Sequence, residues 1–105
     1  MQGCDAVVMP SVWEAYPILT SEVMCCGVPI VATDCPGLRE AVEQTPSVVV
    51  PSKDATALAG GMVRVMEERE IGDAARAFRE AAAMRYDVRR AAEELTVLLR
   101  EMVRR

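Results

Sequence analysis

The chain has 105 residues, of which 51% are hydrophobic and 4% are aromatic, and its formal net charge is -4. These values are typical of one small domain, or of a piece of a larger one, with an aliphatic core, and they exclude a disordered chain. The acidic balance argues against a nucleic-acid-binding surface. No apolar run reaches the roughly 20 residues that span a bilayer, and no basic and apolar leader opens the sequence, so we expect neither a transmembrane segment nor a secretory signal.

Histidine is absent from the sequence, which excludes Ser-His-Asp and Cys-His nucleophile systems within the chain. The four cysteines, at positions 4, 25, 26 and 35, lack the Cys-x-x-Cys spacing of many zinc sites. We therefore expect no metal site, and we interpret the cysteines as buried free thiols of a cytosolic protein.

The first half of the sequence predicts strands that alternate with helices. Short apolar runs predict buried parallel strands at residues 6–9, 29–33 and 47–50. Helices are expected between them, from about residue 19 to 26 and from 37 to about 43.

The second half of the sequence predicts three helices. Asp54 is placed to cap the first of them. Gly60 and Gly61 interrupt this helix, which favours close packing there. Its expected apolar face, read from helical spacing, consists of Leu58, Met62, Val63 and Met66.

An alanine-rich helix is expected at about residues 71–83, and Asp87 is placed to cap the last helix. The arginine and glutamate residues of that last helix indicate a solvated face. The whole order predicts an α/β fold: part of a doubly wound, Rossmann-like parallel sheet of about three strands, with flanking helices and a helical C-terminal tail.

Two carboxylates lie near the carboxyl end of the first predicted strand. Glu14 falls in the loop after that strand, and Glu22 lies about one turn inside the next helix. Ligands of doubly wound folds bind outside the carboxyl ends of the strands, and a helix N-terminus suits a phosphate group. The pair therefore indicates a site for a polyhydroxylated, phosphate-bearing ligand. The simpler alternatives are a solvated loop carboxylate for Glu14, and for Glu22 an exposed helix residue or a partner of Arg39.

The sequence around the two glutamates consists of these segments: Val7-Val8-Met9-Pro10-Ser11, Trp13-Glu14-Ala15-Tyr16-Pro17-Ile18-Leu19, Glu22-Val23-Met24, Cys26-Gly27-Val28-Pro29-Ile30-Val31-Ala32-Thr33-Asp34 and Pro36-Gly37-Leu38-Arg39-Glu40-Ala41-Val42. Through these segments, the stretch from Asp5 to Ala41 resembles the carboxy-terminal donor-binding domain of the family 4 (group 1) retaining glycosyltransferases, which have the GT-B fold. Later segments that fit the family are Val49-Val50-Pro51, Asp54 to Leu58 and Arg85-Tyr86-Asp87. The spacing of the two glutamates is a weak signal alone and a specific one with these neighbours.

The resemblance implies roles for the residues of this site. Glu14 would be the catalytic-site carboxylate that contacts the donor sugar near the reacting carbon, and Glu22 would accept hydrogen bonds from the ribose. The donor-sugar and phosphate-binding segment would comprise Ala15, Tyr16, Pro17, Ile18 and Leu19, with the diphosphate on the amides of the last two. Transfer would retain the anomeric configuration, and no metal or other cofactor is implied.

By the same resemblance, residues 1–105 form part of the C-terminal, nucleotide-sugar donor-binding domain of a GT-B glycosyltransferase. The expected partners are a nucleotide-diphosphate sugar donor, an unknown acceptor, and the missing N-terminal domain or a partner chain, without nucleic acid. We expect the chain alone to be inactive and the protein to be cytoplasmic, or peripheral at the membrane in its full form. The alternatives are a non-catalytic nucleotide-sugar-binding or regulatory module, and a fragment of another GT-B enzyme such as a sugar epimerase or a phosphorylase.

Overall fold

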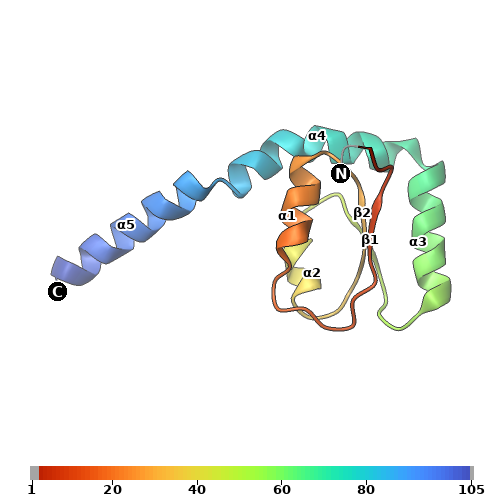
Figure 1. Cartoon of the computed structure of the whole chain (residues 1–105), viewed down its shortest axis with the longest axis horizontal. Helices are drawn as coiled ribbons and strands as arrows, with labels where there is room; N and C mark the ends of the chain where they lie inside the picture. Colours follow the sequence, from red (N-terminus) through yellow and green to blue (C-terminus); the bar gives the residue numbers. More distant parts are fainter. Residues whose placement is uncertain (1–2, 105) are drawn as a thin grey trace.

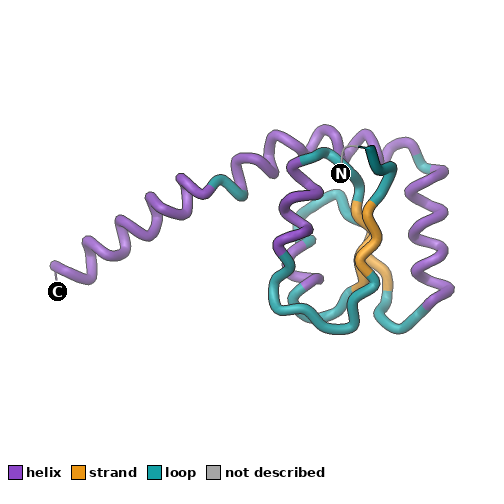
Figure 2. Tube along the Cα trace, viewed as in Figure 1, coloured by secondary structure: helices purple, strands orange, loops and turns teal. Residues whose placement is uncertain are grey.

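The computed structural model describes residues 3–104. Strands and helices alternate in its first half, and three helices follow in its second half (Figures 1 and 2). In chain order the elements are β1 (Val7–Met9), α1 (Ile18–Cys25), β2 (Ile30–Thr33), α2 (Leu38–Ala41), β3 (Val48–Val50), α3 (Ala55–Glu67), α4 (Arg69–Arg85) and α5 (Val88–Arg104).

The three strands form one parallel sheet in the order β1-β2-β3. Val7 of β1 pairs with Ile30 of β2, and Val31 of β2 pairs with Val48 of β3. All four residues of the central strand are buried, as expected for a strand that is covered on both faces. The α/β fold and the parallel sheet predicted from the sequence are therefore confirmed.

Helices cover both faces of the sheet, and successive side chains of β2 alternate between the two cores (Figure 1). Ile30 packs with α1 and α2, in a core that also contains Val23 and Leu38. Val31 points to the opposite face, where it packs with Val48 and α3. Helix α4 crosses the amino-terminal end of the sheet and packs against α1.

Several predicted helix ends are confirmed. Gly27 adopts a φ of 74° just after α1, and its N–H donates to the carbonyl of Met24 at 3.1 Å. The Asp54 carboxylate caps α3 by accepting from the N–H of Ala57 at 2.9 Å. Asp87 does the same before α5, where it accepts from the N–H of Arg89 at 2.9 Å.

The predicted apolar face of α3 is wrong in three of its four residues. Met62, Val63 and Met66 are exposed, whereas Gly61 is buried against the sheet. A Cβ on residue 61 would lie 2.9 Å from Cγ1 of Val31, so the missing side chain permits this close approach. Helix α3 therefore turns a different face to the sheet from the one that helical spacing predicted. Besides Gly61, the residues of α3 that pack on the sheet are Ala57, Leu58 and Val65.

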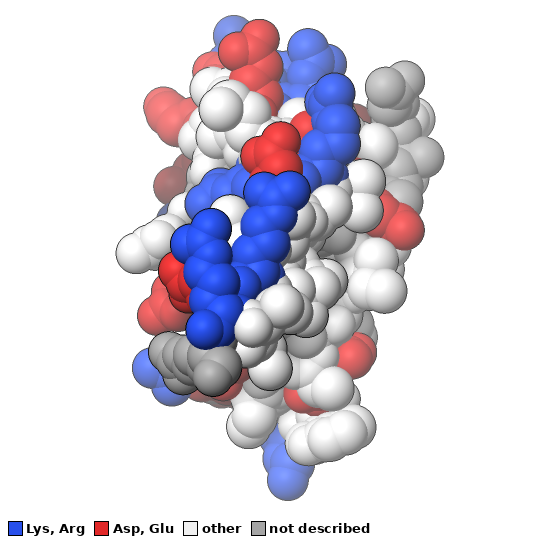
Figure 3. All heavy atoms as spheres, turned by 90° about the vertical axis from the view of Figure 1, so that its left-hand side faces the viewer, with Lys and Arg blue, Asp and Glu red and all other residues white. Residues whose placement is uncertain are grey.

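Helix α5 projects away from the rest of the molecule and buries none of its residues (Figure 1). Figure 3 shows the side from which α5 projects, where Lys and Arg side chains form a band among Asp and Glu. The solvated charged face predicted for this helix is confirmed, but its large apolar side chains are exposed as well: Val88, Leu95, Val97, Leu98, Leu99, Met102 and Val103. Within residues 3–104, no helix is both long enough and apolar enough to cross a membrane.

Candidate functional site

The loops that leave the three strands gather at one end of the sheet (Figures 1 and 2). They comprise residues 10–17 after β1, 34–37 after β2 and 51–54 after β3. We call residues 10–17 the Glu14 loop. Because ligands of doubly wound folds bind at the carboxyl ends of the strands, this end of the sheet is where the predicted site belongs.

Glu14 is half-buried, and hydrogen bonds hold it at the centre of its loop. The hydroxyl of Ser11 donates to Oε1 of Glu14 at 3.0 Å, and the N–H of Glu14 donates to the carbonyl of Pro36 at 3.3 Å. Thr33 in turn fixes Ser11, because its hydroxyl donates to the Ser11 carbonyl at 2.5 Å. Oε2 of Glu14 accepts no hydrogen bond from residues 3–104, so its acceptor positions are not used by the described residues.

Glu22 is the fifth residue of α1, and its side chain is exposed. In the described part of the chain its carboxylate forms no ion pair with Arg39. No hydrogen bond joins Glu14 to Glu22 there either. The structure thus places both residues where the sequence predicted, one in the loop and one about a turn inside the helix, and it does not bring their carboxylates into contact.

The first turn of α1 offers its N–H groups without a side-chain cap. Pro17 occupies the cap position, and no side chain accepts from the first turn. The nearby hydroxyls donate to carbonyls instead: Thr20 to Pro17 at 2.8 Å, and Ser21 to Ile18 at 2.7 Å. Ile18 and Leu19 are both exposed at this end of the helix. Their uncapped amides and the positive end of the helix dipole suit an anionic group.

The rest of the loop lies open to solvent. Trp13 and Tyr16 are 74% and 52% exposed, so neither side chain belongs to the core. Ala15 is exposed and Pro17 is half-buried. The predicted donor-sugar segment is therefore accessible, with two aromatic side chains at its surface.

The predicted burial of the cysteines is confirmed only for Cys35. Cys4 is exposed because it precedes the first strand and lies outside the core. Cys25 and Cys26 are partly buried at the end of α1, where desolvation raises the pKa of the Cys25 thiol. Among residues 3–104, no three Cys, Asp or Glu side chains are grouped so as to hold a metal ion.

Asp34, at the end of β2, has a structural role next to the site. Its carboxylate accepts hydrogen bonds from the N–H and the hydroxyl of Ser52, at 2.9 and 3.0 Å. These two bonds, the backbone one first, lower the pKa of Asp34 from its ordinary value. Because Ser52 follows β3, the bonds tie the carboxyl ends of β2 and β3 together.

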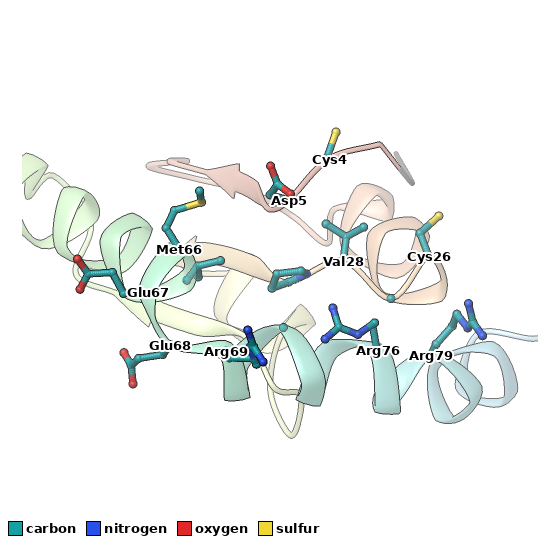
Figure 4. Close-up of a pocket in the computed structure, with 14 residues that line it drawn as sticks. Cys4, Asp5, Cys26, Val28, Met66, Glu67, Glu68, Arg69, Arg76 and Arg79 are labelled. Carbon is teal, nitrogen blue, oxygen red and sulfur yellow. The ribbon is translucent and has the colours of Figure 1, made fainter.

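A cavity of about 820 Å³ lies at the opposite, amino-terminal end of the sheet (Figure 4). Arg69, Arg76 and Arg79 rise toward it from one side of α4, while Glu67 and Glu68 point away. The spacing of these arginines in the sequence places them on one face of α4. Neither Glu14 nor Glu22 lines the cavity, so it is separate from the predicted site.

The chain matches one protein-family model and several known proteins. A sequence model of the family "Glycosyl transferases group 1" matches residues 1–85. Over 102 residues the chain is 29% identical to the D-inositol 3-phosphate glycosyltransferase of Corynebacterium urealyticum, a match that covers 96% of this chain and 24% of that protein. Over 42 residues it is 43% identical to the N,N'-diacetylbacillosaminyl-diphospho-undecaprenol alpha-1,3-N-acetylgalactosaminyltransferase of Campylobacter jejuni, which covers 40% of this chain and 11% of that protein.

Among solved structures, the fold matches sucrose-phosphate synthase from Thermosynechococcus elongatus with a TM-score of 0.77 and 27% sequence identity. The match covers 95% of this chain and 26% of that chain. The present chain thus spans about a quarter, or less, of the length of these three proteins.

Proposed function

Because the chain belongs to the glycosyl transferases group 1 family, we propose that it forms one wall of the donor site of a glycosyltransferase. The donor is a nucleoside diphosphate sugar, and transfer to an acceptor retains the anomeric configuration without a metal ion. The observation that carries this proposal is the juxtaposition of the anchored Glu14 loop with the uncapped first turn of α1. The loop offers a carboxylate oxygen to hydroxyl groups, and the helix offers amides to a diphosphate.

Each part of the donor has a proposed counterpart in the site. The diphosphate binds the amides of Ile18 and Leu19, and the ribose hydroxyls donate to the exposed carboxylate of Glu22. Oε2 of Glu14 accepts from a hydroxyl of the sugar near the reacting carbon. Ala15, Tyr16 and Pro17 line the path between sugar and diphosphate.

A further domain or a partner chain completes the site and supplies the acceptor. Two features of residues 3–104 support this part of the proposal: β1 pairs with a strand on one side only, and α5 buries none of its residues. The match to the synthase covers 95% of this chain, so it includes at least part of the 17-residue helix α5. Most of the synthase lies outside the match. A diphosphate that faced only amides and two carboxylates would lack cationic partners, so the 105-residue chain alone binds its donor weakly and does not transfer sugar. The cytoplasm, including the membrane surface, is the proposed location.

The ribose role of Glu22 is tested by titrating the ¹⁵N-labelled chain with UDP, GDP and ADP and following its amide signals. Glu22→Ala is expected to weaken binding of the best of these nucleotides about tenfold, because the ribose loses a charged acceptor. Glu93→Ala, an exposed glutamate on α5, is the matched control and leaves the affinity unchanged. Equal affinity in the Glu22→Ala and Glu93→Ala chains would remove the ribose assignment.

The sugar role of Glu14 is tested by comparing a nucleotide with the corresponding nucleotide sugar. Glu14→Gln is expected to weaken binding of UDP-glucose, or of the GDP or ADP sugar if that base is preferred, while binding of the free nucleotide stays the same. Loss of both to the same extent would contradict a contact with the sugar. Turnover of any of these sugars by the purified chain would contradict only its proposed inactivity. If the chain binds no nucleotide at all, the donor-site proposal fails.

A further inference from the structure

We propose that Gly37 is a positioning residue of the donor site, because its missing side chain leaves the space that the backbone of Glu14 and Ala15 occupies. A Cβ built on residue 37 would overlap the carbonyl oxygens of both residues, well inside the 3.0 Å below which real Cβ atoms are essentially never found. The inference rests on the proposed function in one respect: the Glu14 loop must be a ligand-binding loop for its position to matter.

Gly37 cannot easily move away from the Glu14 loop. It has a φ of 84°, which favours glycine, and it directly precedes α2. The next residue, Leu38, is fully buried in the core beside α1, and Ala41 is fully buried one turn later. A shift of residue 37 would therefore have to drag α2 out of its packing, so a side chain at this position would displace the loop instead.

Hydrogen bonds also attach the Glu14 loop to the segment of chain that contains Gly37. The N–H of Glu14 donates to the carbonyl of Pro36, the residue immediately before Gly37. The loop is also bound to the end of β2 through the hydrogen bond from Thr33 to the Ser11 carbonyl. The loop after β2 thus holds the Glu14 loop at a short distance, which only a glycine at position 37 permits.

This contact sets where the Glu14 carboxylate and the chain that leads into α1 lie. A misplacement of about 1 Å in a binding or reacting group can lower a reaction rate about 100-fold. A methyl group at position 37 displaces the two carbonyls, and with them the carboxylate held by Ser11. The predicted effect is on the site and not on the sheet, because the three atoms nearest to this Cβ all belong to the Glu14 loop.

The test compares Gly37→Ala with Gly27→Ala in the ¹⁵N-labelled chain. Gly27 is a matched control because its φ is 74°, while a Cβ there would meet its nearest atom, Cα of Arg76, at an ordinary 3.4 Å. Both variants force alanine into a conformation that it rarely adopts, but only Gly37→Ala creates the overlap. Without ligand, Gly37→Ala is expected to shift the amide signals of Glu14 and Ala15 and to speed hydrogen exchange of the Glu14 N–H, while Gly27→Ala leaves these unchanged.

With UDP, GDP or ADP as the probe, Gly37→Ala is expected to weaken binding at least tenfold and Gly27→Ala less than twofold. Unchanged Glu14 and Ala15 signals in Gly37→Ala would overturn the proposal, as would equal nucleotide affinity in the two variants. A Gly37→Ala chain that does not fold, beside a folded Gly27→Ala chain, would also overturn it, because Gly37 would then support the fold rather than the loop. If the wild-type chain binds no nucleotide, the donor-site proposal fails, and the ligand-free signals still decide the role of Gly37.

Discussion

The hydroxyl of Thr33, the last residue of β2, donates a hydrogen bond of 2.5 Å to the carbonyl of Ser11 in the Glu14 loop. The two residues are 22 positions apart, and the bond is one of the few that attach this loop to the sheet. Thr33 is 3% exposed and Ser11 is half-buried, so the bond is partly shielded from water. It therefore couples the stability of the sheet to the position of the candidate site.

Thr33→Val is expected to lower the free energy of unfolding by about 1–3 kcal/mol, because the Ser11 carbonyl loses its partner in a partly buried place. Urea unfolding followed by circular dichroism measures this change. Thr96→Val is the matched control, since the hydroxyl of Thr96 donates to the Ala92 carbonyl on the exposed surface of α5, and its loss changes stability by less than about 0.5 kcal/mol. Similar losses of unfolding free energy in the two variants would mean that the bond to Ser11 contributes no more to stability than the exposed bond in α5.

The adjacent glycines of α3 are expected to respond to alanine in opposite ways. Gly61→Ala should destabilise the protein by about 1–3 kcal/mol, because the new Cβ would lie 2.9 Å from Val31 and 3.0 Å from Val50. Gly60→Ala should stabilise it by about 0.5–1 kcal/mol, because a Cβ there meets no atom within 4 Å and alanine favours the helix. The midpoints of thermal unfolding provide the measurement, and a gain in both variants would show that α3 moves freely on the sheet.

The hydrogen bonds from Ser52 make stability depend on the ionisation of Asp34. They lower the pKa of its carboxyl in the folded state, so their stabilising effect is present above the unfolded value of about 3.8. The effect should disappear as the pH falls from about 5 through 3.8 and below the folded pKa. Asp34→Asn should therefore destabilise the protein at pH 7 and make a smaller difference at pH 3, as measured by urea unfolding at both pH values. A difference that stays constant with pH would contradict this account.

Removal of α5 is expected to leave the remaining domain as stable as before. The chain that ends at Asp87 should unfold within about 0.5 kcal/mol of the full chain, because α5 buries none of its residues. Tyr86→Ala provides the contrast, since Tyr86 packs against the core and its hydroxyl lies 3.7 Å from Sδ of Met24. That substitution should cost about 1–3 kcal/mol. A large loss on removing α5 would show that the helix packs on the domain in solution.

Local sequence signals predicted the order and nature of the elements well. Gly27 and Asp54 mark helix ends through properties of the residue itself, a left-handed conformation in one case and a capping carboxylate in the other. The apolar runs specified buried strands, and their alternation with helices specified a parallel sheet. The positions of Glu14 and Glu22 at the carboxyl end of the sheet follow from the same order, while their roles stay predictions.

Contacts between distant segments were not predictable from the same signals. Helical spacing placed Met62 and Met66 in the core, because the periodicity of the sequence does not reveal that Gly61 approaches the sheet so closely. In the same way, Gly37 looked like an ordinary helix-start residue, and only the folded chain places it against the backbone of Glu14.

The junction between α4 and α5 has a mechanical consequence. Helix α5 contains 17 residues, which at about 1.5 Å per residue form a rod of about 25 Å. A rotation of about 10° at residues 86–87 would therefore displace the far end of the rod by about 4 Å. Since α4 packs against α1, which begins where the Glu14 loop ends, this junction joins the rod to the elements that carry the candidate site.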